Sequence, residues 1–576
     1  MQEEINWQYY TPNSKDFNSL KGNPNFSDIQ KNLLLKRGLK TEEQINNHLD
    51  FSIKELHSPF LLKDMMKSIE RIDTAIKDDE KIMIYGDFDV DGTTAVSLVY
   101  LFLKEFTENI TYYIPDRFNE GSGISVKSIE YAKSIDISLI IALDCGMSSN
   151  EEIKYANSLG MNIIICDHHY QNGMLPEAYS IINPKQTACN YPFKELSACG
   201  VGFKLINGFL IHKKRVDLID KLFNYIDYVA VSTACDLVNL TDENRIFVKY
   251  GLELINNNPK YLYQSLFALS GIFYNHYDKC FNKQIKISDL SYLIGPKINA
   301  AGRVGNACKI IDLLISHDLH QIEAITLDIN HDNNKRKTIE KKILKEAHDY
   351  LKINNNNSNI IIIKSENWNK GVIGIVANKL VEYYKKTTII LTSDNNDEYS
   401  GSARTCNDIN LYDIIQQNSK FIKKFGGHRS AVGLTIDNNQ FDNFKNNIEH
   451  IFDNHVHLKS TNTFEIDSTL NCSDLNEELF KFIEKLAPFG FGNPTPIFSI
   501  ESLFKITEIK ISNNNNLKLK LTTNIGDSDK ELEFIGYNQA HLKNILKDGI
   551  FCIIFEINYN TQIESKATLV IKDIKY

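Results

Sequence analysis

The sequence lacks several features that mark whole classes of protein. Its 576 residues include ten cysteines but no Cys-x-x-Cys pair, which argues against structural zinc and against a disulfide framework and favours a reducing cytoplasm. No apolar run approaches the roughly 20 residues that a membrane-spanning helix needs. The acidic N-terminus, Met1–Asn6, does not have the basic and then apolar layout of a secretory signal. We therefore expect a soluble cytoplasmic protein.

The sequence also has no excess of basic residues. Its 64 lysines and arginines face 73 aspartates and glutamates, and the formal net charge is −9. This argues weakly against a nucleic-acid partner, because proteins that bind phosphate backbones usually carry a basic face. Bound metal ions would cancel part of the acidic excess, and a channel can be basic on an acidic protein. The net charge therefore leaves a nucleic-acid substrate open.

One short segment concentrates negative charge. Asp87, Asp89 and Asp91 alternate directly after an apolar run that is expected to form a strand at 81–85. Three carboxylates this close repel one another, and hard cations such as Mg²⁺ and Mn²⁺ relieve the repulsion through oxygen ligands. A calcium-binding loop is excluded, because its twelfth position requires Glu where this sequence has Leu98, and because a strand precedes the turn.

Two further polar clusters follow apolar runs in the same way. Asp144 ends one run, and Asp167, His168 and His169 follow the next. Strand and helix patterns alternate here, which predicts a mostly parallel sheet that gathers these residues at the carboxyl ends of its strands. The expected strands lie at 81–85, 111–115, 137–143, 162–166 and 180–183, and the expected helices at 93–105, 125–134 and 150–159.

Each cluster also has an ordinary explanation. Asp144 could be a helix N-cap, although Ser148 or Ser149 would cap the next helix just as well, and the two histidines could be surface residues. In the metal-site interpretation one histidine binds metal, the other faces substrate, and Asp167 orients the ligating ring. Asp236 ends another apolar run and needs a cation or hydrogen bonds if it is buried.

Three glycine-containing segments carry cationic side chains. They are Gly295–Arg303, Gly401–Arg404 and Phe425–His428. We expect each to be a turn whose small residues let a ligand approach, with backbone N–H groups and arginine forks available for phosphate. Any one of them alone is more often an ordinary turn.

The chain is too long for a single core, so we expect several domains. The patterns predict an α/β protein in which a parallel-sheet domain is joined by a long helix to a smaller α/β domain, followed by an OB-like β-barrel. The predicted boundaries are 1–75 for an N-terminal helical segment, 76–330 for the parallel-sheet domain, 331–353 for the connector helix, 354–460 for the second α/β domain and 461–576 for the barrel.

Together these segments resemble a known group of enzymes. The motifs of the DHH phosphoesterase superfamily are matched by Gly86–Gly92, Asp144–Gly146, Asp167–His169 and Asp236. Four further segments resemble the RecJ single-stranded-DNA exonuclease branch: Gly295–Gly305, Trp368–Ala377, Phe425–His428 and Leu486–Phe498. The similarity spans nearly the whole chain.

The resemblance implies DHH, DHHA1-type and OB domains and a 5′→3′ exonuclease acting in DNA repair and recombination. Such an enzyme releases 5′-mononucleotides from single-stranded DNA with two Mg²⁺ or Mn²⁺ ions. By the family pattern the metal ligands are Asp89, Asp91, Asp144, His168 and Asp236, with Asp87 as a further ligand or a supporting group and Asp144 bridging the ions. His169 would contact phosphate, and the groups that hold the DNA would be His169, Arg303, Arg404, Gly426, Gly427 and His428.

A DHH-family phosphodiesterase acting on short oligonucleotides or cyclic dinucleotides is the alternative, because it would share the metal motifs. The length of the chain and the predicted barrel argue against it, and against a metal-dependent pyrophosphatase. A non-catalytic DNA-binding relative would have lost several acidic residues. Family likeness also implies a single-strand-binding protein and a RecQ-type helicase as partners, and we expect a monomer.

Overall fold

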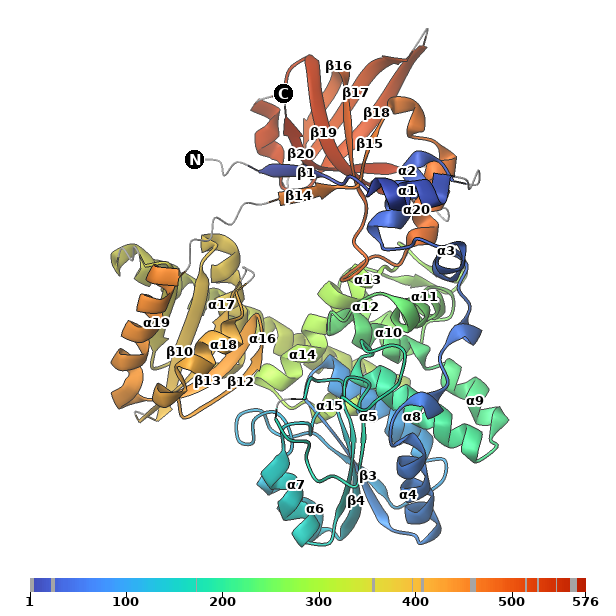
Figure 1. Ribbon diagram of the computed structural model, residues 1–576. Coiled ribbons are helices and arrows are strands. Elements are labelled where there is room, and N and C mark those ends of the chain that lie inside the picture. The colour runs from blue at the N-terminus through green and yellow to red at the C-terminus, as the bar shows by residue number, and fades with distance from the viewer. Residues whose placement is uncertain are drawn as a thin grey trace.

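The computed structural model describes residues 5–21, 26–171, 173–354, 358–395, 397–405, 409–455, 463–512, 515–525, 528–544, 546–559 and 567–575. They form two α/β lobes joined by a long helix, and a β-barrel above the first lobe (Figure 1). Among the helices of these residues, none is long and apolar enough to cross a membrane.

The first lobe is built on a five-stranded parallel sheet in the order β3-β2-β4-β5-β6. Its central strands are apolar because helices cover both faces, α5 and α8 on one side and α6 and α7 on the other. Every strand and helix predicted between residues 81 and 183 is present. The bounds are β2 (Lys81–Gly86), α5 (Val90–Leu103), β3 (Ile110–Tyr113), α6 (Val126–Ser134), β4 (Ile137–Leu143), α7 (Asn150–Ser158), β5 (Asn162–Cys166) and β6 (Ser180–Ile182).

Helices complete this lobe. They are α4 (Met65–Lys77), α8 (Ala198–His212), α9 (Val216–Phe223), α10 (Ile226–Cys235), α11 (Asp242–Asn257), α12 (Tyr261–Ala268), α13 (Ile287–Asp289), α14 (Gly295–Val304) and α15 (Cys308–Ile315), with a hairpin of β7 (Tyr274–Asn275) and β8 (Cys280–Phe281). The prediction of a turn at Gly295–Arg303 is wrong, because this segment is α14. Its glycines serve close packing: a Cβ at Gly302 would lie 3.0 Å from the carbonyl oxygen of Phe88.

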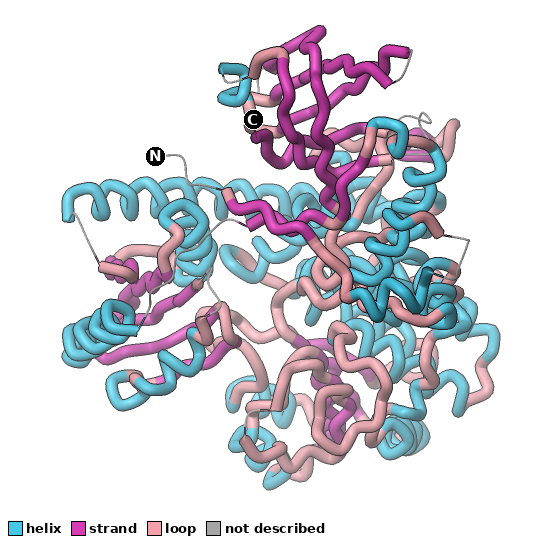
Figure 2. Tube along the Cα trace, turned by 45° about the horizontal axis from the view of Figure 1, so that its top comes forward, coloured by secondary structure: helices cyan, strands magenta, loops and turns pink. Residues whose placement is uncertain are grey.

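Helix α16 (Leu319–Asn354) connects the two lobes and is 36 residues long. Figure 2 shows a long unbroken helix between them. Ile322 and Ile329 near its start belong to the core of the first lobe, whereas Ile343 and Ala347 belong to a core of the second lobe. The helix therefore ties the lobes together by packing at both ends.

The second lobe has a mixed five-stranded sheet in the order β12-β13-β11-β10-β9. The bounds are β9 (Ile360–Ser365), α17 (Lys370–Tyr384), β10 (Thr387–Asn395), β11 (Glu398–Arg404), α18 (Leu411–Gln417), β12 (Lys424–His428), β13 (Ala431–Asp437) and α19 (Phe441–His455). The turn predicted at Phe425–His428 is wrong, because this segment is a paired strand. Gly401–Arg404 is likewise not a turn but part of β11, where the sequence pattern indicates a strand near 399–403. Position 401 requires glycine, because a Cβ added there would lie 2.5 Å from Leu391 Cδ2.

The C-terminal barrel contains β16 (Ile497–Ile511), β17 (Leu517–Ile525), β18 (Ser528–Gly536), β19 (Gly549–Asn558) and β20 (Thr568–Lys575). Pairing of β16 with β19 closes it, and β15 (Ser468–Leu470) pairs with β16. Strand β16 has 15 residues because it pairs with β17 along one part and with β19 along another.

The N-terminal residues lie against this barrel. β1 (Asn6–Tyr9) pairs in parallel with β14 (Thr463–Ile466). It is followed by α1 (Ser14–Lys21), α2 (Asp28–Lys36) and α3 (Glu42–Leu49), and apolar residues of α2 and α3 share one core with the barrel and with α20 (Glu477–Leu486). The two ends of the chain thus form one unit (Figure 1).

Candidate metal centre

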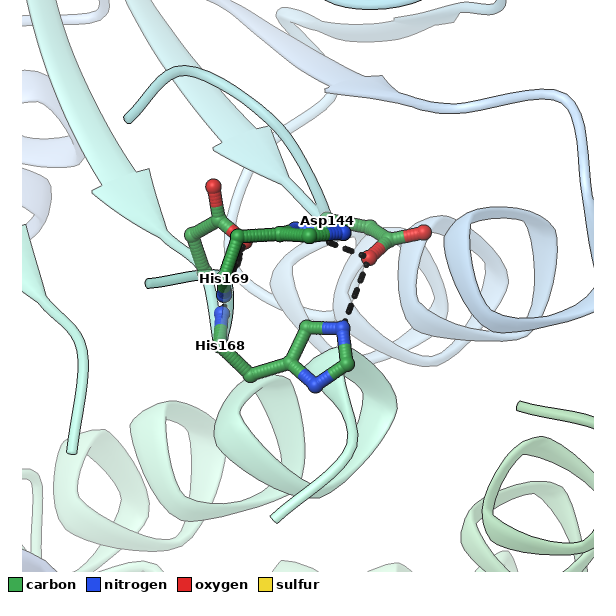
Figure 3. Close-up of side chains that lie close together, drawn as sticks. Asp144, His168 and His169 are labelled. Atoms are coloured by element: carbon green, nitrogen blue, oxygen red, sulfur yellow. Dashed lines mark hydrogen bonds and ion pairs between the residues drawn. The ribbon is translucent and has the colours of Figure 1, made fainter. Parts of the chain in front are cut away.

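Carboxylate and imidazole groups from four segments meet at the carboxyl-terminal edge of the parallel sheet. Asp91 lies in the first turn of α5, just after β2, and Asp144 and His168 lie in the segments that follow β4 and β5. Asp236 caps the C-terminus of α10. His168 Nε2 lies 3.3 Å from Asp144 Oδ1. The same nitrogen lies 3.6 Å from Asp91 Oδ2 and 3.6 Å from Asp236 Oδ2. Figure 3 shows His168 and His169 turned toward Asp144.

This cluster fits a divalent cation. Burial, together with the charges of Asp91 and Asp89, raises the pKa of Asp144 well above its usual value. Burial lowers the pKa of His168, so its imidazole is neutral and offers little compensating charge. Both ring nitrogens of His168 are buried and, within the described residues, have no hydrogen-bond partner. Crowded carboxylates and an unpartnered neutral imidazole are a donor set that Mg²⁺ or Mn²⁺ would satisfy.

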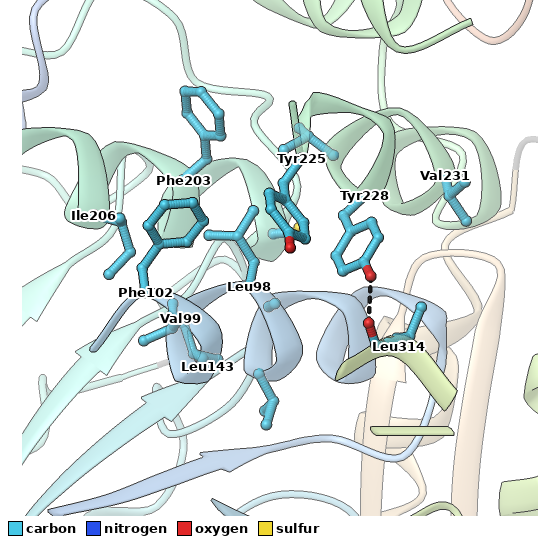
Figure 4. Close-up of a cluster of buried hydrophobic side chains, with 14 of the residues drawn as sticks. Leu98, Val99, Phe102, Leu143, Phe203, Ile206, Tyr225, Tyr228, Val231 and Leu314 are labelled. Carbon is cyan, nitrogen blue, oxygen red and sulfur yellow. Dashed lines mark hydrogen bonds between the residues drawn. The ribbon is translucent and has the colours of Figure 1, made fainter. Parts of the chain in front are cut away.

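Asp91 is held by donors on both of its oxygens. The backbone N–H groups of Ala198 and Cys199, at the start of α8, donate to it at 2.8 Å each, and Ser232 Oγ on α10 lies 2.6 Å from Oδ1. Apolar side chains of α5, α8 and α10, among them Phe102 and Phe203, pack between these helices (Figure 4). The core thus fixes the position of this carboxylate.

Asp89 and Asp87 complete the acidic turn. Asp89 is the N-cap of α5 and accepts from Gly92 N at 3.1 Å. Burial and then the charge of Asp89 raise the pKa of Asp87 to about 7. The turn is tight enough to require glycine, because a Cβ at Gly92 would lie 2.4 Å from the carbonyl oxygen of Asp87. Asp87 therefore belongs to the same turn and adds to its crowded negative charge.

Asp167 supports the second histidine rather than the first. Its Oδ1 lies 2.7 Å from His169 Nδ1, so the prediction that Asp167 orients the ligating histidine is wrong. Burial disfavours the charged form of His169, but the carboxylate of Asp167 outweighs this and raises the pKa of His169 to about 9. The ring of His428, from β12 of the second lobe, lies 5.4 Å from the ring of His169. The two lobes therefore meet at the cluster.

Three partly buried arginines lie on the other side of the acidic turn. Arg303 donates to the carbonyl oxygen of Gly371 at 2.9 Å, and Arg404 donates to Ser402 Oγ at 2.8 Å. Burial and then the neighbouring charges of Arg117 and Arg404 lower the pKa of Arg303 to about 9. Burial and the charge of Arg117 lower the pKa of Arg404 to about 10. Cationic groups crowded together in this way would be stabilised by a nearby anion.

Arg117 was not anticipated. Its guanidinium lies 4.8 Å from the centre of the Phe88 ring, within the acidic turn. It follows β3, so a search for charged residues of either sign after each predicted strand would have found it. The predicted binding residues Gly426 and Gly427 lie beside His428 in β12. Gly427 has a φ of 146°, and a Cβ there would meet the Ala431 carbonyl oxygen at 2.2 Å.

Comparisons with known proteins agree with this architecture. Residues 81–233 match the DHH family N-terminal domain, residues 357–454 the DHHA1 domain and residues 466–573 the RecJ OB domain. The single-stranded-DNA-specific exonuclease RecJ of Bacillus subtilis (strain 168) is 31% identical over 574 residues, which are 99% of this chain and 71% of that protein. The chain belongs to the RecJ family.

Other RecJ proteins are also similar to this chain in sequence or in fold. RecJ of Escherichia coli (strain K12) is 26% identical over 85% of this chain and 86% of its own length. The crystal structure of RecJ in complex with Mn²⁺ from Thermus thermophilus matches all of this chain and 80% of that one, with a TM-score of 0.81 at 19% identity. The predicted fold class, with its parallel-sheet domain, DHHA1-type domain and OB barrel, is therefore confirmed.

Proposed function

We propose that this chain is a metal-dependent exonuclease that hydrolyses single-stranded DNA from its 5′ end and releases 5′-mononucleotides. The observation that carries the proposal is the meeting of two chemistries at one place. A carboxylate–imidazole cluster suited to Mg²⁺ or Mn²⁺ lies next to three partly buried arginines, and the His169–His428 contact brings the second lobe to the same point. Metal and arginine side by side are the groups that phosphodiester hydrolysis needs.

Metal binding belongs to the first lobe. Two ions would be held by Asp89, Asp91, Asp144, His168 and Asp236, with Asp87 supporting the same turn. When bound, the ions polarise the scissile phosphate and activate the attacking water. Asp144 would be the ligand shared by the two ions; its burial and its contacts with both histidines support this role.

The remaining residues bind the substrate. His169 is protonated at neutral pH because Asp167 holds its Nδ1, so it can donate Nε2–H to a phosphate oxygen. Arg117, Arg303 and Arg404 would receive the terminal 5′-phosphate. An anion site that stops the DNA strand at its 5′-phosphate would explain why such an enzyme cleaves from the 5′ end.

Selectivity for a single strand would come from the other domains. His428 and the strand β12 close over the cluster from the second lobe. The OB barrel would hold the strand beyond the cluster by stacking and charge, as such folds do. A single-strand-binding protein, a RecQ-type helicase and a monomeric state are proposed from family likeness alone.

The direct test digests 5′-labelled single-stranded DNA, duplex DNA, RNA and a dinucleotide with Mg²⁺ or Mn²⁺. We expect mononucleotides from single-stranded DNA and little product from the duplex. Asp144→Asn should lower the rate at least about 100-fold, because it removes a metal ligand while keeping the side-chain shape. Its unfolding temperature without metal should not fall, because burial already disfavours the charge of Asp144.

Asp349→Asn is the matched control. Asp349 is an exposed aspartate on α16 and pairs only loosely with Lys352, at 3.8 Å. Near-normal digestion by Asp144→Asn would remove the metal-ligand assignment. Degradation of the dinucleotide but not of a long strand would overturn the proposed substrate in favour of a short-oligonucleotide phosphodiesterase.

A further inference from the structure

The sheet places a second cationic group at the opposite end of the site from Arg117. In the order β3-β2-β4-β5-β6, Arg117 follows the edge strand β3 and Lys185 follows the edge strand β6. The turns of β2, β4 and β5, which carry the metal-binding cluster, lie between them. Neighbouring strands are about 5 Å apart, so Lys185 lies roughly two strand spacings beyond Asp144.

Lys185 has a largely buried side chain and holds an exposed aromatic ring. The side chain is only 9% exposed, and its Nζ lies 3.3 Å from Glu195 Oε2. The same Nζ lies 4.7 Å from the centre of the Tyr170 ring. Tyr170 directly follows His169 and remains 60% exposed. One side of the ring therefore contacts an ammonium group, and much of the ring is open.

The position of this ring relative to the cluster is fixed by Asn183. This residue is fully buried. Its Nδ2 donates to the carbonyl oxygen of His169 at 2.8 Å, and its Oδ1 accepts from Lys185 N at 2.8 Å. The turns that carry Tyr170 and Lys185 are thus joined through one amide. A ring held in advance loses little conformational entropy when a ligand stacks on it.

Electrostatics agree with this placement. The charge of Lys185 acts on His168, Asp236 and His428, whereas that of Arg117 acts on Asp87, Asp89 and the other arginines. Lys185 therefore lies on the side of the histidines, and Arg117 lies beside the acidic turn.

We propose that Tyr170 stacks on the base of the second nucleotide, immediately 3′ of the scissile phosphate, with Lys185 as the residue that positions the ring. This inference rests on the proposed function. If the terminal phosphate lies at the arginines and the scissile phosphate at the metal cluster, the next nucleotide leaves toward β5 and β6. An exposed aromatic ring beside the path of the DNA backbone offers a flat apolar surface on which a nucleobase can stack. Such stacking tolerates every base.

The test measures hydrolysis of single-stranded oligonucleotides that carry one abasic residue at positions 1 to 6 from the 5′ end. In the parent enzyme, loss of the base at position 2 should raise KM about tenfold, as expected for one lost stacking contact. Tyr170→Ala should raise KM by a similar factor on intact DNA, and the abasic residue at position 2 should then have almost no further effect. Tyr170→Trp should restore the sensitivity, which a merely structural role would not do.

Tyr383→Ala is the matched control, because Tyr383 is 72% exposed on α17 and its ring contacts His348 on the connector helix. It should behave like the parent. If Tyr170→Ala remains as sensitive to the abasic residue at position 2 as the parent, the stacking role is wrong. If the parent does not digest single-stranded DNA at all, the proposed function has failed instead, so the two failures are distinguishable.

Discussion

Asp91 illustrates how single residues prepare the metal site. The hydroxyls of Ser197 and Ser232 have one proton each, and Ser232 Oγ donates its proton to Asp91. Ser197 Oγ must therefore donate to Ser232 Oγ, and Ser197 Oγ in turn accepts from Gly200 N. With the two N–H groups of α8, this chain leaves the carboxylate little freedom to turn. Groups that orient a ligand in this way usually matter almost as much as the ligand itself.

Ser232→Ala should therefore weaken metal binding. It removes one donor to Asp91 and leaves the backbone donors in place, so we expect the Mn²⁺ concentration for half-maximal activity to rise about tenfold. The dissociation constant from calorimetric titration should rise by a similar factor.

Ser97→Ala tests whether any lost buried hydroxyl has this effect. Ser97 is fully buried on α5 and donates to the carbonyl oxygen of Thr93 at 2.8 Å. Its variant should have a normal metal dependence. Equal metal dependence of the Ser232→Ala variant and the parent would contradict the orienting role of Ser232.

At the scale of elements, the sequence predicts strands better than it predicts α14. The run Ile137–Leu143 is apolar because β4 is covered on both faces, so its pattern and its position in the fold agree. In α14, small residues occur because a neighbouring turn lies against the helix, and that neighbour is distant in sequence. Local pattern therefore indicated a turn where tertiary packing stabilises a helix.

Gly302→Ala should test this packing. The added Cβ would lie 3.0 Å from the Phe88 carbonyl oxygen and 3.2 Å from Phe88 Cβ, so α14 or the acidic turn must shift. Alanine favours helix more than glycine does, so a loss of activity cannot come from helix propensity. We expect kcat to fall roughly threefold, since even a shift of a few tenths of an ångström misplaces ligands at a reacting centre.

Ala301→Gly is the complementary control on the same helix. It weakens α14 by about 1 kcal/mol without adding volume. It should lower the unfolding temperature and leave kcat near that of the parent. If Gly302→Ala retains full kcat at saturating metal, the contact between α14 and the acidic turn does not set the geometry of the site.

The candidate site shows the same division between local and long-range information. The gathering of Asp89, Asp144 and His168 could be predicted, because strand ends of a parallel sheet share one edge. The pairing of Asp167 with His169 could not, because it depends on how one turn folds. The contact of His169 with His428 depends on how two lobes pack, and no local pattern encodes it.

At the scale of the whole molecule, Arg245 connects the first lobe to the unit formed by the two chain ends. This arginine is 2% exposed. It donates to the carbonyl oxygens of Leu486, Ala487 and His48, at 2.7, 3.1 and 3.1 Å. The barrel is therefore held to the metal-binding lobe through buried charge, which makes the junction sensitive to any further positive charge.

His48 lies at this junction and makes its stability depend on pH. Burial, then the charges of Arg245 and Arg37, lower the pKa of His48 to about 3, against 6.5 in the unfolded chain. Between these values the unfolded chain binds the extra proton, so His48 costs no stability above pH 6.5 and progressively more as the pH falls toward 3.

In a Trp368→Phe background, Trp7 on β1 becomes the single tryptophan and reports on this unit. From about pH 7.5 to about pH 5.0, the parent should lose about 2 kcal/mol of unfolding free energy relative to His48→Asn, as measured by urea denaturation at each pH. If both proteins lose the same unfolding free energy, carboxylates elsewhere, rather than this histidine, make the junction sensitive to acid.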